Sequence, residues 1–67
     1  MTKDEFLSML RENHNKMLLS KKQTAKELGV SEGTLDRLRT GGQITSKKVL
    51  GQIMFDIGEV ARFLADA

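Results

Sequence analysis

The 67-residue sequence contains no cysteine and only one histidine, His14. Without cysteine the chain can form neither a disulfide nor a thiolate metal site. A single histidine does not supply the several ligands that a protein-built zinc site needs. The sequence also has no carboxylate pair, no nucleophile with an adjacent base and no glycine-rich phosphate loop. We therefore expect no metal, no cofactor and no catalytic residues, and hence no enzyme.

Long apolar runs are missing as well. The longest is Met17-Leu18-Leu19, whereas a helix that crosses a bilayer needs about 20 apolar residues. Residues 1–4 contain no apolar signal region. A chain of 67 residues buries a thin core and forms one domain. We expect a soluble, cytoplasmic protein with no membrane partner.

Positive charge is concentrated in the middle of the chain, although the net charge is only +2. Residues 21–48 contain seven basic and three acidic side chains, a net charge of +4, whereas residues 1–20 are neutral and residues 49–67 carry −2. A surface that faces nucleic-acid phosphates needs such a concentration. The alternative is that these lysines only solvate short helices.

The stretch from Ser20 to Thr40 predicts two short helices joined by a tight turn. Ser20 and Ser31 are suited to cap the two helices. Gly29 lies where the first helix must end sharply, because glycine adopts a positive φ cheaply. Ala25 is the small residue over which the second helix can cross closely. This pattern is typical of a helix-turn-helix, and the plainer alternative is a helical hairpin that only packs.

The second helix of this pair, residues 31–40, has an inward stripe formed by Leu35 and Leu38. Its opposite face would enter a DNA major groove. Arg37 is the best candidate for base contact, since a guanidinium pairs bidentately with guanine O6 and N7. An ion pair with Asp36 or Glu32, or simple solvation, is the alternative for Arg37. The residues of this opposite face are Gly33, Asp36, Arg37 and Thr40.

Residues 43–49 and 52–56 are rich in β-branched and aromatic side chains, and Leu50-Gly51 separates them. They predict a small β-hairpin that would act as a wing, residues 44–55. Lys47 and Lys48 precede its turn and are candidates for phosphate or minor-groove contact.

The complete set of candidate DNA-binding residues includes the start of the first motif helix, where backbone N–H groups favour phosphate. The set comprises Lys22, Gln23, Ser31, Gly33, Thr34, Asp36, Arg37, Arg39, Thr40, Lys47, Lys48 and Gln52.

The two ends of the chain each predict one more helix. Thr2 can cap the first of these, and Asp56 with Glu59 forms a capping signature for the last. We expect the N-terminal helix to pad the core, with a partner or dimer contact as the alternative, and His14 to be an exposed polar residue.

The predicted fold is mostly α with a small β-hairpin, a winged helix-turn-helix in the order α-α-α-β-β-α. Residues 1–17 form the N-terminal helix and residues 18–67 the winged domain, and together they make one compact domain.

The stretches LLSKKQTAKELGVSEGTLDRLRTGGQI and VLGQIMFDIGEVARFL resemble the excisionase-like winged-helix proteins, a branch of the MerR-like DNA-binding domains. The resemblance covers about Leu18 to Leu64 and implies a protein that binds double-stranded DNA. Such proteins are usually encoded on phages or other mobile elements, where they serve as recombination directionality factors, known as excisionases, or as small regulators of transcription. The implied protein partners are an integrase, or further copies of the chain in cooperative rows on DNA.

The sequence departs from this family at several positions. Glu32 stands where a basic or small polar residue is usual, Asp36 lies on the groove-facing side, and Thr45 replaces a frequent proline. The second wing strand lacks the family's arginines. An alternative function is therefore a protein-interaction module on the same scaffold, which would dock its partner through the N-terminal helix or the apolar tip Val49-Leu50.

Overall fold

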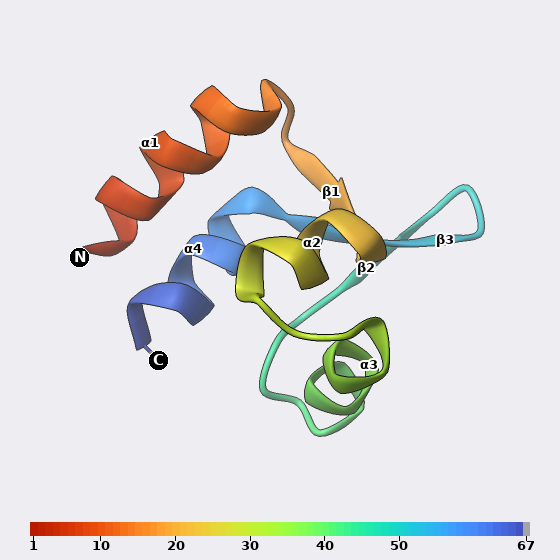
Figure 1. Ribbon diagram of the computed structural model, residues 1–67. Coiled ribbons are helices and arrows are strands. Elements are labelled where there is room, and N and C mark those ends of the chain that lie inside the picture. Colours follow the sequence, from red (N-terminus) through yellow and green to blue (C-terminus); the bar gives the residue numbers. More distant parts are fainter. Residues whose placement is uncertain (67) are drawn as a thin grey trace.

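Helices and short strands alternate along the chain in the computed structural model, which describes residues 1–66 (Figure 1). The predicted order of the helices and of the two hairpin strands is confirmed. A short strand between the first two helices was not predicted. The elements are α1 (Lys3–His14), β1 (Leu18–Ser20), α2 (Lys21–Leu28), α3 (Glu32–Thr40), β2 (Lys47–Val49), β3 (Gln52–Asp56) and α4 (Ile57–Asp66).

The additional strand β1 turns the expected hairpin into a three-stranded antiparallel sheet with the order β1-β3-β2. Leu19 lies opposite Phe55 of β3, and both side chains are fully buried. The sequence did not predict this strand. A run of three residues carries no periodic signal, and its pairing partner lies far along the chain. Because a two-stranded ribbon is marginal alone, β1 supports the wing by pairing with the inner part of β3.

The residues predicted to cap α1, α2 and α3 do so in the structure. Thr2 and Ser20 each form a capping box. The hydroxyl of the capping residue accepts from the backbone N–H three residues later, and the side chain of that later residue accepts from the backbone N–H of the capping residue. Ser31 caps α3 by accepting from Thr34 N. Gly29 ends α2 in the left-handed region, with φ of 70°. The starts of α1, α2 and α3 are therefore specified by nearby residues.

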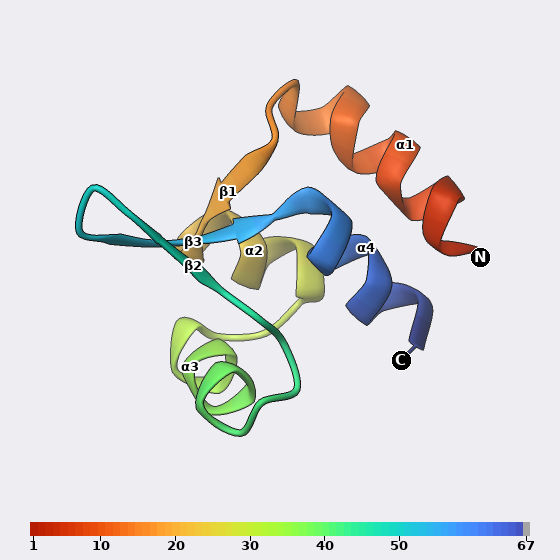
Figure 2. The ribbon, with the colours of Figure 1, turned by 180° about the vertical axis from the view of Figure 1, so that it is seen from behind.

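The core lies between the sheet and the four helices, and Ala25 is buried within it as the helix-turn-helix pattern requires. Both ribbon views show α1 running beside α4 (Figures 1 and 2). Leu10 of α1 is buried, and Phe6 and Leu7 pack against the core, so α1 does contribute core packing. The buried apolar residues are Leu10, Leu19, Ala25, Leu35, Ile44, Phe55, Ile57, Val60 and Ala61.

His14 differs from its predicted role as an exposed polar residue. Its ring is half-buried at the end of α1, and Nε2 lies 2.8 Å from Oε1 of Glu27 in α2. The prediction was wrong because this contact joins α1 to a residue of α2 that lies 13 positions along the chain, which no local pattern indicates. Among residues 1–66, no helix combines the length and the apolar character needed to cross a membrane.

Candidate nucleic-acid interface

The turn between α2 and α3 fixes the direction of α3 relative to α2. The N–H of Gly29 donates to the carbonyl of Lys26 at 3.2 Å, and the N–H of Val30 donates to the carbonyl of Ala25 at 3.0 Å. These two bonds form a Schellman motif, which satisfies carbonyls at the end of α2. Ser31 begins the next helix immediately afterwards. The backbone direction into α3 is thus set by hydrogen bonds within six residues.

Three side chains form a hydrogen-bonded row along one side of α3. The hydroxyl of Ser31 donates to Oγ1 of Thr34 at 3.0 Å, and Nη2 of Arg37 donates to the same oxygen at 3.0 Å. The spacing i, i+3, i+6 keeps the row on one helix face. Within residues 1–66, Arg37 has no ion-pair partner. The row therefore presents an oriented, uncompensated guanidinium on the exposed surface of α3.

Asp36 is held between two helices and is not free on that surface. Its Oδ1 lies 3.0 Å from Nζ of Lys21 in α2 and 3.3 Å from Nη2 of Arg39. The hydrogen bond from Lys21, followed by that from Arg39, holds the pKa of the Asp36 carboxyl below its ordinary value. The ion pair between Asp36 and Arg37, which was the alternative to base contact, does not form, because Asp36 pairs with Lys21 of α2 and with Arg39. Arg39 also turns inward, and its Nε is buried with no hydrogen-bond partner in the described part of the chain.

Two other predicted groove residues behave differently from each other. The hydroxyl of Thr40 donates to the carbonyls of Asp36 and Arg37, at 2.9 and 3.2 Å, so its hydrogen is used within the helix. Gly33 is exposed, and a Cβ at this position would come no closer than 3.9 Å to Oγ of Ser31. Internal packing thus leaves room for a side chain at residue 33. Any requirement for glycine there has to come from outside the chain.

The two candidates at the start of α2 also differ. Gln23 belongs to the capping box, where its Oε1 accepts from the backbone N–H of Ser20 at 3.0 Å. Its side chain is therefore already occupied. Lys22 is exposed and forms no ion pair within residues 1–66, so it is the more available of the two for a phosphate.

The wing is a β-hairpin with a two-residue turn, Leu50-Gly51. Both turn residues have positive φ, 51° and 81°, as a type I′ turn requires. Lys47 lies opposite Met54 and Lys48 opposite Ile53. Since successive side chains of a strand point to opposite faces, the two lysines lie on opposite faces of the ribbon.

The charges of the two wing lysines are also differently placed. Nζ of Lys47 lies 3.9 Å from a carboxylate oxygen of Asp56, at the limit of an ion pair. Lys48 makes no ion pair in the part of the chain that the structure describes. Gln52 is exposed beside the turn, opposite Val49. The wing therefore offers one partly compensated and one free positive charge.

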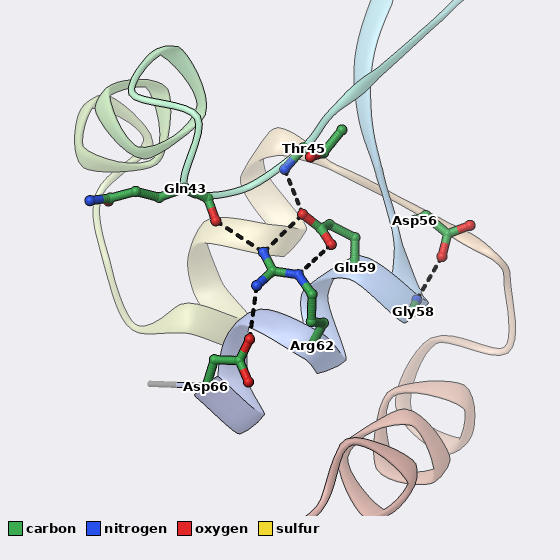
Figure 3. Close-up of polar contacts among 7 residues, drawn as sticks. All are labelled: Gln43, Thr45, Asp56, Gly58, Glu59, Arg62 and Asp66. Carbon is green, nitrogen blue, oxygen red and sulfur yellow. Dashed lines mark hydrogen bonds and ion pairs between the residues drawn. The ribbon is translucent and has the colours of Figure 1, made fainter.

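A cluster around Arg62 of α4 anchors the loop that joins α3 to the wing (Figure 3). Nη2 of Arg62 donates to the carbonyl of Gln43 at 3.0 Å, and Nε donates to Oε1 of Glu59 at 2.7 Å. Oε2 of Glu59 in turn accepts from the backbone N–H of Thr45 at 2.7 Å. Asp66 completes the cluster, with Oδ2 3.0 Å from Nη1 of Arg62. Two backbone groups of the loop are thus bonded to one helix.

The predicted capping signature of α4 forms only in part. Asp56 accepts from the N–H of Gly58 at 2.7 Å, whereas Glu59 bonds to Thr45 and Arg62 (Figure 3). The side chain of Glu59 is drawn away by a charged partner one turn along the helix. Sequence reasoning missed this cluster. The alternation of charge at i, i+3 and i+7 along α4 was the available signal.

Comparison with known proteins finds no matching protein-family model, no similar curated protein and no similar solved structure.

Proposed function

We propose that this chain is a sequence-specific DNA-binding protein that recognises double-stranded DNA. Helix α3 enters the major groove, and the β2–β3 hairpin contacts phosphate or the minor groove as a wing. The observation that carries the proposal is the row Ser31-Thr34-Arg37, which holds an exposed guanidinium that has no carboxylate partner among residues 1–66. An oriented guanidinium suits guanine, whose O6 and N7 accept two hydrogen bonds in the major groove. Binding of Arg37 to a base would leave Ser31 and Thr34 to hold its orientation or to contact phosphate.

The distribution of charge supports the same proposal. From Arg37 to Phe55 the chain contains no acidic residue, and this segment includes the second half of α3 and nearly all of the wing. The one acid in the middle of α3, Asp36, is neutralised by Lys21 and Arg39. A phosphate backbone therefore meets lysines and an arginine with little opposing charge.

The biological role that fits this activity is that of a small cytoplasmic DNA-binding protein, either an excisionase of a mobile element or a transcription regulator. An integrase, or further copies of the chain on neighbouring sites, would be its protein partners. A protein-interaction module is the second candidate function, favoured by the exposed methionines Met9 and Met17 on and just after α1. Salt dependence separates the two, because counterion release accompanies binding to any duplex.

The test measures binding of the parent protein to a mixed-sequence duplex at several salt concentrations, followed by selection of its preferred site from a random pool. Arg37→Ala should weaken binding to the preferred site by roughly 1–3 kcal/mol and blur the sequence preference. Its matched control is Arg11→Ala, which removes an exposed arginine from α1 and should change neither property.

The wing lysines should respond differently from Arg37. Lys47→Ala combined with Lys48→Ala should weaken all duplexes about equally and flatten the slope of log K against log salt by up to about 2. The pair Lys3→Ala and Lys16→Ala removes the same charge at two positions outside the hairpin and serves as the control. A folded parent that binds no duplex at about 50 mM salt, where phosphate contacts are strong, would contradict the proposal.

A further inference from the structure

The tip of the wing carries an apolar side chain that nothing in the described chain covers. Leu50 is 99% exposed, more than any other large apolar residue among residues 1–66. Both ribbon views show the β2–β3 turn projecting well away from all the helices (Figures 1 and 2). Neighbouring Val49 is also exposed. The outermost part of the wing therefore exposes two apolar side chains.

The backbone at Leu50 is unfavourable for this residue as well. Its φ of 51° lies in the left-handed region, which a leucine adopts at greater cost than glycine or asparagine. The usual occupants of a type I′ turn are Asn-Gly and Asp-Gly. Leucine is thus poorly suited both to the conformation and to the solvation of this position. A strained residue at an exposed site points to a contact made with another molecule.

The surroundings of Leu50 indicate the chemistry of that molecule. Lys47 and Lys48 lie just behind the tip on opposite faces of the ribbon, and the chain has no acid between Asp36 and Asp56. A protein surface of ordinary size buries about 800 Å² on each partner, far more than a two-residue apolar tip can provide. A DNA minor groove, about 6 Å wide, is narrow, anionic at both rims and apolar along its sugar walls.

We propose that Leu50 is an apolar wedge that enters the DNA minor groove beside the major-groove site of α3 and partly unstacks one base step. Lys47 and Lys48, on the two faces of the ribbon, would then meet phosphates on the two sides of the groove. Leucine is among the side chains that act in this way in minor-groove-binding proteins. Pyrimidine–purine steps unstack most easily, so the wedge should favour them. This inference rests on the proposed DNA binding, and it assigns the tip a contact distinct from those of the lysines.

The experiment compares the parent with Leu50→Asn, using a mixed-sequence duplex that contains 2-aminopurine, whose fluorescence rises when it unstacks. Asparagine suits the left-handed turn, so Leu50→Asn should fold with an equal or higher melting temperature. It should bind the duplex roughly tenfold more weakly, because it lacks the buried apolar contact. Its log K against log salt slope should match the parent's, and the fluorescence rise should disappear. Leu50→Met keeps an apolar tip and should retain both the affinity and the fluorescence rise.

The outcomes separate the wedge from DNA binding itself. A parent that binds the duplex without a fluorescence rise, or Leu50→Asn binding as tightly as the parent, would overturn the wedge and leave DNA binding intact. If Leu50→Asn abolished self-association of the protein and left its DNA contacts unchanged, the tip would be a protein contact and the wedge would again be excluded. A folded parent that binds no duplex would overturn both proposals together.

Discussion

The ammonium of Lys21, at the first position of α2, lies 3.0 Å from the carboxylate of Asp36 in the middle of α3. This ion pair joins the two helices of the helix-turn-helix and removes a negative charge from the surface proposed to face DNA. Arg39 approaches the same carboxylate from within α3. One acid thus stabilises the relative position of the two helices while two basic residues offset its charge.

Replacing Asp36 should therefore change stability and DNA binding in opposite directions. Asp36→Asn removes the ion pairs, so we expect a small fall in melting temperature, as is usual for exposed pairs. It also frees two positive charges near the phosphates, so duplex affinity should rise and the salt slope should steepen. Thermal melts and duplex titrations of the same preparation measure both. Glu12→Asn, which removes an exposed acid from α1, is the control, and an equal gain in affinity there would indicate a net-charge effect only.

Gly33 offers a similar separation of stability from binding. Gly33→Ala should stabilise the protein by about 0.5 kcal/mol, because alanine loses less backbone entropy in a helix and nothing obstructs its methyl group. If DNA approaches the backbone of α3 closely at this residue, the added methyl group should weaken binding at the preferred site. Chemical denaturation and a duplex titration would record the two effects. Unchanged affinity would place residue 33 away from the DNA.

The buried hydroxyl of Thr24 should make the protein less stable than it could be. Oγ1 of Thr24 is fully buried in α2 and has no hydrogen-bond partner among residues 1–66, and an unpaired buried polar group is costly. Thr24→Val replaces the hydroxyl with a methyl of similar shape and should raise the free energy of unfolding by about 1 kcal/mol. Thr40→Val, which loses a bonded hydroxyl, should give no such gain. A destabilised Thr24→Val would mean that the hydroxyl is satisfied in solution.

Stability should fall in acid through the cluster around Arg62. The Arg62 guanidinium holds the pKa of the Glu59 carboxyl below its ordinary value of 4.5, and the N–H of Thr45 lowers it further. A carboxyl whose pKa is lower in the folded state stabilises the fold above its unfolded pKa. That contribution is present above about pH 4.5 and is lost as the pH falls through the folded pKa.

The variant Glu59→Gln tests this dependence. It should melt at a lower temperature than the parent at neutral pH, and its melting temperature should decline less steeply in acid. The residual decline would come from Asp36 and Glu5, whose pKa values are also lowered. Melts across a pH series measure both slopes, and parallel curves for the two proteins would exclude Glu59 as a source of acid sensitivity.

Much of the candidate interface could be predicted from the sequence, because its elements depend on residues close together in the chain. The caps at Ser20 and Ser31 and the turn at Gly29 each use bonds spanning at most five residues. The choice of Arg37 as an outward-facing residue followed from the helical period and is consistent with its exposure. The hairpin turn at Leu50-Gly51 was likewise placed correctly.

Only the tertiary structure decided which polar groups are occupied and which remain free. Asp36 and Arg37 are neighbours in sequence, yet Asp36 pairs with Lys21 of another helix while Arg37 stays exposed. The strand β1, the bond between His14 and Glu27 and the anchoring of Gln43 by Arg62 join segments at least 13 residues apart. Local signals specify each helix and turn through short-range hydrogen bonds and side-chain periodicity. Long-range pairs depend on how those elements pack, and no pattern within one element encodes that packing.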